Sequence, residues 1–292
     1  MPAAPQVFDR HIWCQRRSRA ARQGGQHDFL FREVAARLGA RLDIVKKDFP
    51  RVLELGTATG AMAEVLSGRA GTIDVVRADY VDGANVDVVL ESETLDFSPQ
   101  SFDAVISCLD LHWINDLPGV LAQVHRILKP DGLFLAALLG GETLHELRTA
   151  FLQAEMNATG GGSLRVSPFA DVRDIGGLLQ RAGLALPVAD TEKIVVDYSD
   201  PLRLMKDLRG MGAANVAAAR LKHMSRRDVV FGAAKAYQEM FGDDAGRIPA
   251  TFEVIYAIGW VPHESQQKPL MRGSGTVSLA DVLKPVPPSK DN

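Results

Sequence analysis

The stretch VLELGTATG, residues 52–60, determines how the rest of the sequence is interpreted. Its first four residues are typical of a buried strand, and a loop with glycine at both ends follows them. Gly56 and Gly60 allow a sharp turn and a close approach of the backbone to a ligand. A helix that begins after Gly60 would point its positive end at an anionic group. The stretch therefore indicates a nucleotide-type ligand, although a simple strand-to-helix turn would have the same local pattern.

Strands and helices alternate along the first half of the chain. After a strand at 52–55, we expect strands at 73–78, 86–90, 102–108 and 133–138, and helices at 29–45, 61–67 and 117–128. Lys129-Pro-Asp-Gly132 is typical of a helix stop followed by a turn. Continuous apolar strands separated by helices predict a parallel sheet that is covered on both faces.

The second half is less regular. We expect helices at 143–157 and 171–182, strands at 194–198 and 251–260, and a helical segment at 201–242 that Gly210 and Gly212 interrupt. The prediction is an α/β, Rossmann-like fold with a seven-stranded, mostly parallel sheet, helices on both faces and a helical insertion. A single domain is expected over 1–284, with a helical cap at 1–48, a core at 50–200 and 250–262, an insertion at 201–249 and a disordered tail at 285–292.

Composition excludes several classes of protein. The net charge of −3 over 292 residues argues against a general nucleic-acid binder, which would be basic. No apolar run approaches the roughly 18 residues of a membrane-spanning helix, which leaves peripheral association open. Cys14 and Cys108 are too few for a disulfide framework or a zinc ribbon, and they fit a reducing compartment.

An acidic residue stands where a ribose would be recognised. Asp79 ends the second predicted strand, and its carboxylate can accept hydrogen bonds from both ribose hydroxyls. A dinucleotide site requires G-x-G-x-x-G, whereas the order here is G-x-A-x-G, with Met62 in place of a third glycine. Ala58 would narrow the loop, and Glu54 can receive an amino group through water. This spacing fits S-adenosylmethionine better than a dinucleotide.

Two further segments resemble class I methyltransferases: LESETLDFSPQSFDAVIS at 90–107 and ILKPDGLF at 127–134. The resemblance implies that an acid and its neighbour hold the adenine, and that a later strand ends beside the reacting methyl group. With those positions included, the expected cofactor-binding residues are Glu54, Gly56, Thr57, Ala58, Gly60, Asp79, Tyr80, Glu91, Ser92, Ser107 and Cys108, with Leu109 at the same strand end.

A narrower resemblance covers residues 7–280. It is carried by FDRHIWCQRRSRAA (8–21), LHWINDLPG (111–119), GGETLHELR (140–148), SPFADVRDIGGLLQRAG (167–183), GMGAAN (210–215) and IGWVPHESQQKPLMRGSGTVS (258–278). These segments resemble the complex I assembly factor 5 family, whose mitochondrial members hydroxylate an arginine of the quinone-site subunit of NADH dehydrogenase. The malonyl-carrier-protein methyltransferase of biotin synthesis is a second relative that shares FDR, the glycine loop and LHW-like residues.

The arginine-rich start has two interpretations. Five arginines against a single acid in the first 25 residues can form a mitochondrial transit peptide. Phe8, Ile12 and Trp13 instead give a basic helix of the mature fold an apolar face. Because FDR and RAA belong to the resemblance, it implies a helix of the fold, no removable presequence, and a bacterial cytoplasmic setting, or the matrix side of the membrane in a mitochondrial relative.

Catalytic residues are not determined by pattern. Methyl transfer depends mainly on positioning, whereas a protonated guanidinium acceptor would need carboxylates to bind and orient it. Glu142, Glu146 and Glu264 lie in the resembling segments, although each is equally typical of an exposed surface charge. His112 and Trp113 are candidates for residues that pack over the cofactor.

Hydroxylation rests on the resemblance alone. It usually needs iron held by two histidines and a carboxylate. Asp110 and His112, with His145 or His263, offer those ligand types, but their spacing is not diagnostic and we predict no metal site. Cys108 is not expected to be a nucleophile, because no base is positioned to activate it. His263, Glu264, Arg272 and Ser274 are expected to form a substrate-recognition loop or a polar connection without a partner.

The sequence thus predicts a methyltransferase-fold enzyme that binds S-adenosylmethionine and acts on a protein substrate, possibly a complex I subunit. Three alternatives stay open: an arginine hydroxylase, a malonyl-carrier-protein O-methyltransferase, and a non-catalytic assembly chaperone.

Overall fold

The structure is a computed structural model that describes residues 6–23, 25–57, 59–83, 85–267, 274 and 278. It divides into two units, residues 1–262 and 263–292, and each is described by itself. Among the described residues, no helix has the length and apolar character needed to cross a bilayer.

The first unit is built on a seven-stranded sheet with the order β3-β2-β1-β4-β5-β7-β6. Neighbouring strands from β3 to β5 run parallel, and β7 runs antiparallel to both β5 and β6. This is the predicted fold class. The strands are β1 Arg51–Leu55, β2 Asp74–Asp79, β3 Val88–Val89, β4 Phe102–Cys108, β5 Leu128–Leu139, β6 Ala185–Tyr198 and β7 Ile248–Trp260.

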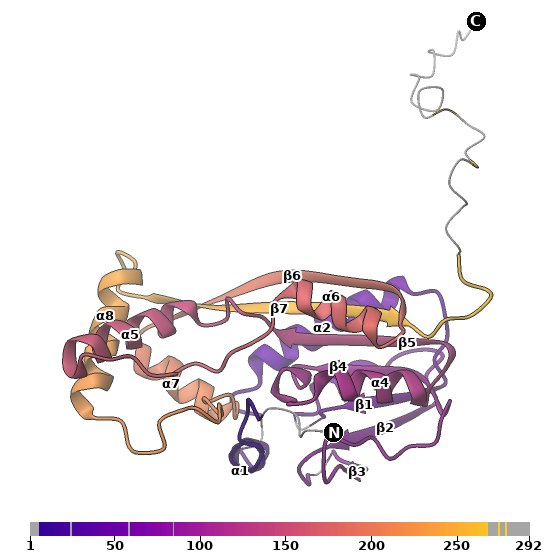
Figure 1. Ribbon diagram of the computed structural model, residues 1–292, viewed down its shortest axis with the longest axis horizontal. Helices are drawn as coiled ribbons and strands as arrows, with labels where there is room; N and C mark the ends of the chain where they lie inside the picture. Colours follow the sequence, from indigo (N-terminus) through magenta and orange to yellow (C-terminus); the bar gives the residue numbers. More distant parts are fainter. Residues whose placement is uncertain are drawn as a thin grey trace, which may run out of the picture. The chain divides into compact units, whose positions relative to one another are not determined.

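Helices cover both faces of the sheet (Figure 1). Successive side chains of a strand point to opposite faces, so each strand supplies two cores. Val52 and Ile106 pack toward α2 Phe29–Ile44 and α3 Ala61–Ser67. Leu53 and Val105 pack on the other face, which α4 Leu117–Ile127 and α6 Val172–Arg181 cover.

The strand predicted at 194–198 is the end of a much longer one. β6 and β7 form a long antiparallel pair, continuous from Val188↔Ile258 to Tyr198↔Ile248, although α7 and α8 lie between them in the chain. β6 is an edge strand, and exposed residues such as Asp190 and Lys193 interrupt its apolar pattern. A search for continuous apolar runs therefore finds only its last five residues.

The turn predicted at Lys129-Pro-Asp-Gly132 is wrong. α4 ends at Ile127 as expected, but these four residues lie within β5. The ladder with β4 passes from Phe102↔Leu128 directly to Ala104↔Leu133, so the segment bulges out of register without ending the strand. Asp131 adopts a positive φ of 61° within this bulge.

The interruption expected at Gly210 and Gly212 in the segment 201–242 is present, but it is longer than expected and extends to residue 226. The segment contains α7 Pro201–Gly210 and α8 Arg227–Phe241, with a non-helical connection between them. Gly212 has a φ of 76° in this connection, a left-handed conformation that glycine favours. α5 His145–Thr159 packs on α8.

The N-terminal helix α1, Arg10–Ala21, is attached to that same connection. Phe8 and Ala217 form an antiparallel bridge, and the Asp9 amide donates to the Val216 carbonyl at 2.8 Å. The Arg220 guanidinium binds the Asp9 carboxylate at 3.0 Å. The residues at the start of α1 are thus bonded to the α7–α8 connection, about 200 residues later in the chain.

Truncating a buried side chain of β7, the strand next to the edge strand β6, should destabilise the fold. Ile255 of β7 is fully buried, so we expect Ile255→Ala to lower the free energy of unfolding by about 2–5 kcal/mol in urea titrations followed by circular dichroism. Val195→Ala on the adjacent strand is the control, because that side chain is 56% exposed; its effect should stay within about 1 kcal/mol. Equal losses from both variants would contradict the assigned core.

Candidate functional site

The glycine loop after β1 is shaped by close contacts. Gly56 has a φ of 88° and Gly60 a φ of 73°. A Cβ atom at Gly56 would lie 2.3 Å from Cβ of Asp110, and one at Gly60 would lie 2.6 Å from Nδ2 of Asn85. Both positions therefore require glycine on steric and conformational grounds. Ala58, a predicted loop residue, lies outside the described residues.

Buried polar atoms without hydrogen-bond partners gather at this edge of the sheet. The atoms are Glu54 Oε2, Thr57 Oγ1, Tyr80 Oη, Ser107 Oγ and both carboxylate oxygens of Asp110. Buried polar groups normally have partners, and leaving one unpaired costs about 1–3 kcal/mol. These residues come from the ends of three neighbouring parallel strands. Their unpartnered atoms form one polar group, called the cradle from here on, to which a ligand can make hydrogen bonds.

Burial disfavours the deprotonated, charged form of two carboxyl groups in the cradle. Burial raises the pKa of Glu54 to about 7. Burial also raises the pKa of Asp110, and the nearby Arg17 cation opposes that shift. Near neutral pH, Glu54 can therefore exist with or without its proton.

Arg17 of α1 occupies the centre of the site. Its Nε and Nη2 atoms donate to the two Asp79 oxygens at 2.8 and 2.7 Å, and Nη1 lies 2.9 Å from Oδ1 of Asp110 as an ion pair. Asp79 also accepts from the Tyr80 and Val81 amides. Asp79 and Asp110 are both 0% exposed. The carboxylate predicted to bind a ribose thus holds a guanidinium in this state.

The remaining predicted cofactor residues differ in burial. Cys108 is buried, and its Sγ lies 3.8 Å from the Phe31 carbonyl; burial raises the pKa of its thiol well above the usual range. Glu91 and Ser92 are exposed on the loop after β3. Glu93, which the sequence analysis did not single out, accepts from the Asn115 and Asp116 amides at 2.9 and 2.8 Å and fixes this loop.

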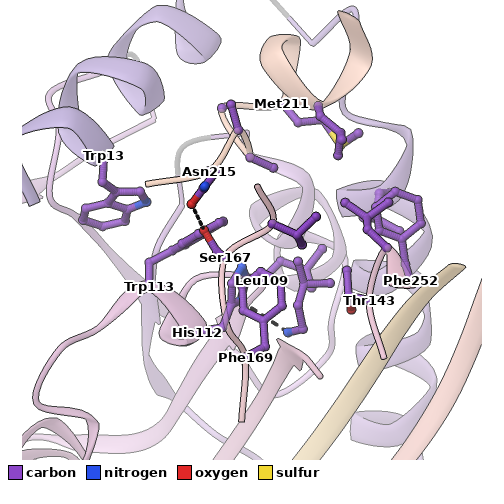
Figure 2. Close-up of a pocket in the computed structure, with 18 of the residues that line it drawn as sticks. Trp13, Leu109, His112, Trp113, Thr143, Ser167, Phe169, Met211, Asn215 and Phe252 are labelled. Atoms are coloured by element: carbon purple, nitrogen blue, oxygen red, sulfur yellow. Dashed lines mark hydrogen bonds between the residues drawn. The ribbon is translucent and has the colours of Figure 1, made fainter. Parts of the chain in front are cut away.

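A second cavity of about 70 Å³ lies beside the cradle (Figure 2). The rings of His112, Trp113 and Phe169 pack against one another in its wall, with centroids 4.6–5.5 Å apart. Trp13 of α1 and Met211 of the α7–α8 connection also line it. This volume is room for a few water molecules, so a larger ligand needs the walls to move.

His112 presents a neutral imidazole to this cavity. Burial lowers its pKa to about 3, and the Arg17 charge adds to the shift. Its Nδ1 accepts from the Leu139 amide at 3.4 Å, which leaves the proton on Nε2. The residue is therefore a hydrogen-bond donor.

Polar residues of the cavity come from segments that the sequence analysis singled out without assigning them a role. The Ser167 hydroxyl donates to Oδ1 of Asn215 at 3.1 Å, and the Asn215 amide donates to the Leu164 carbonyl at 2.6 Å. The Arg165 guanidinium is held by the buried carboxylate of Glu155, at 2.7 Å from Nε to Oε1. Ser167 and Asn215 could have been indicated only by their place in the SPFADVR and GMGAAN segments, whereas Arg165 and Glu155 lie outside both segments and had no such signal.

Neither of the candidate glutamates in the first unit, Glu142 and Glu146, lines the aromatic cavity. Glu142 is exposed, and Glu264 belongs to the second unit, with Arg272 outside the described residues. Glu146 is buried but accepts from the Thr251 hydroxyl at 2.5 Å, which joins α5 to β7. His145 lies on the surface beside Glu146. In the part of the chain that the structure describes, no three His, Cys, Asp or Glu side chains group closely enough to hold a metal ion.

Comparison with known proteins agrees with this architecture. Residues 23–187 match the methyltransferase domain family. The chain is 40% identical over 289 residues to the arginine-hydroxylase NDUFAF5 of Danio rerio, covering 95% of this chain and 90% of the relative. The chain belongs to the NDUFAF5 family. The human member of the NDUFAF5 family is also 40% identical, over 97% of this chain and 85% of its own length.

More distant relatives carry another activity. The malonyl-[acyl-carrier protein] O-methyltransferase of Laribacter hongkongensis is 34% identical to this NDUFAF5 family member, over 89% of this chain and 92% of the relative. Among solved structures, the YcgJ protein of Bacillus subtilis aligns with a TM-score of 0.52 at 16% identity, covering 78% of this chain and 99% of its own. That likeness concerns the fold alone.

The raised pKa of Glu54 predicts a pH-dependent stability. Between its usual value near 4.5 and the folded value of about 7, the folded protein binds more protons than the unfolded chain, so Glu54 removes stability as pH rises through this window. We expect Glu54→Gln to gain about 1–3 kcal/mol relative to wild type on going from pH 5 to pH 8, measured by urea unfolding. Glu142→Gln, an exposed control, should show no such gain; an unchanged difference for Glu54→Gln would refute the assignment.

Proposed function

We propose that this protein is an enzyme that binds S-adenosylmethionine in the cradle at the ends of β1, β2 and β4, and that it modifies an arginine side chain of a protein partner during assembly of respiratory complex I in the bacterial cytoplasm. The observation that carries the proposal is the set of buried, unpartnered polar atoms beside the glycine loop. The membership in the NDUFAF5 family supports the arginine and the partner.

The residues present fit the cofactor. Thr57 and Ser107 offer unpartnered hydroxyls and Glu54 an unpartnered carboxyl oxygen, which suit the amino and hydroxyl groups of an adenosyl amino acid. Asp110 packs against Gly56 and Asn85 packs against Gly60, so close approach of a ligand to this backbone requires those two side chains to move. Asp79 would take the ribose hydroxyls once its oxygens are released from Arg17.

When bound, S-adenosylmethionine supplies a methyl group on a sulfonium sulfur. The chain's own contribution is to position the acceptor and exclude water. The rings of Trp113 and Phe169 form a dry wall, and His112 can donate from Nε2 to an oxygen of the substrate. In positioning the acceptor and excluding water, these residues do not need to act as a general acid or base.

A second candidate is methylation of a malonyl carboxylate on a carrier protein. Arg17 and Arg165 are the charged side chains among the described residues that line the aromatic cavity. Both are paired with buried acids, and if one of these pairs opened, the free guanidinium would bind a carboxylate rather than another guanidinium. Relatives named for that activity match most of the chain.

Mass spectrometry separates these candidates. The protein is incubated in air with S-adenosylmethionine, a two-electron reductant and either the recombinant quinone-site subunit of complex I or malonyl-acyl carrier protein, so that both a methyl donor and the dioxygen and electrons for hydroxylation are present. We expect a modified arginine in the subunit, with the mass of a methylene unit for methylation or of one oxygen atom for hydroxylation. Modification of the carrier protein alone would select the second candidate, and an unmodified subunit that still binds would indicate a chaperone.

Cofactor binding is tested separately by calorimetry with S-adenosylhomocysteine. Asp79→Asn should weaken binding by at least about tenfold, or about 1.4 kcal/mol, because it removes an acceptor for the ribose. Asp82→Asn, an exposed aspartate three residues later, should bind like wild type. Absence of binding in the wild-type protein would overturn the proposed cofactor.

A further inference from the structure

The Arg17 side chain is bound as a ligand would be. Three of its nitrogens face three carboxylate oxygens at 2.7–2.9 Å, two from Asp79 and one from Asp110. Its Cζ lies 5.3 Å from the Trp13 ring centroid, within range of a cation–π contact. Planar, forked recognition of this kind is specific for a guanidinium and does not suit an ammonium group.

The two carboxylates do not depend on Arg17 equally. Asp79 has backbone donors from Tyr80 and Val81 in addition to the guanidinium. Asp110 is 0% exposed, its contact with Arg17 is ionic, and neither of its oxygens has a hydrogen bond. Asp110 is therefore a buried carboxylate whose oxygens can still accept hydrogen bonds, and another guanidinium could donate them.

The guanidinium lies between two cavities. One cavity, of about 280 Å³, is lined by Thr59 of the glycine loop and by Asn85. The other is the aromatic cavity of His112 and Trp113. Arg17 lines both of them, as do Phe31 and Met211. Withdrawal of Arg17 would thus open the boundary between the glycine loop and the aromatic cavity.

Withdrawal would also change the charge at that boundary. With Arg17 in place, its guanidinium compensates the carboxylates of Asp79 and Asp110. Without it, Asp79 and Asp110 stand uncompensated, because Arg165 is already paired with Glu155. Buried carboxylates without a partner strongly favour an incoming cation.

We propose that Asp110 is the guanidinium-binding residue of the substrate site, that Arg17 fills this subsite from within as an internal substitute, and that the guanidinium of the target arginine replaces it there. Asp79, released at the same time, becomes available to the cofactor ribose. This inference rests on the proposed function, since it assigns the arginine subsite of that same site. Asp110 positions the guanidinium and takes part in no covalent step.

The test uses the full-length chain and a small probe, N-acetyl-L-arginine amide, with N-acetyl-L-citrulline amide as its uncharged counterpart. Arg17→Ala empties the subsite, and Arg19→Ala is the matched control because Arg19 is exposed on the same helix. We expect Arg17→Ala to bind the arginine probe at least about tenfold more tightly than Arg19→Ala does, without a gain for the citrulline probe. Adding Asp110→Asn to Arg17→Ala should abolish the gain.

A second variant covers the case in which Arg17→Ala does not fold. Asp110→Asn alone keeps both hydrogen bonds between Arg17 and Asp79 and is nearly isosteric. With saturating S-adenosylhomocysteine, it should bind the arginine probe at least about tenfold more weakly than wild type.

The inference is overturned if Arg17→Ala binds both probes alike, or if Asp110→Asn leaves the arginine affinity unchanged. These outcomes are distinct from failure of the proposed function. If S-adenosylhomocysteine binds to no variant, the cofactor proposal fails, while the preference of Arg17→Ala for arginine is still measured without the cofactor.

Discussion

The site depends on one buried electrostatic arrangement, a guanidinium from α1 held by the carboxylates of Asp79 and Asp110. All three side chains are almost wholly removed from water. Removing one partner of a buried ion pair costs about 3–5 kcal/mol, because a charge is left without compensation. The position of α1 over the sheet is therefore tied to the charge state of the two strand ends beneath it.

The sheet topology explains why these acids meet. β1, β2 and β4 are neighbours and run parallel, so their carboxyl ends lie at the same edge. Glu54, Asp79 and Asp110 come from those three ends or the residues just after them. Ligands of open α/β sheets bind at this edge.

Features that have a local sequence pattern could be predicted from the sequence, and features that depend on contacts between distant residues could not. β1 and β4 are continuous apolar runs, and they were predicted within one residue. The glycine turn and the placement of Asp79 at the end of β2 followed from the spacing of Gly56, Gly60 and Asp79. The edge strand β6 was largely missed, because one side of it faces solvent. The contact between Arg17 and Asp79 spans 62 positions and has no local signature, so Arg17 was read only as part of a basic helix.

The bridge between Phe8 and Ala217 has a consequence for motion. Backbone hydrogen bonds on both sides of it, Asp9 to Val216 and Ala218 to Val7, hold the start of α1 to the α7–α8 connection. That connection also carries Asn215, which lines the aromatic cavity. Because of these hydrogen bonds, a tilt of α1 away from the sheet must also move the α7–α8 connection. Movement of α1 at the polar cradle and reshaping of the aromatic cavity would then occur together.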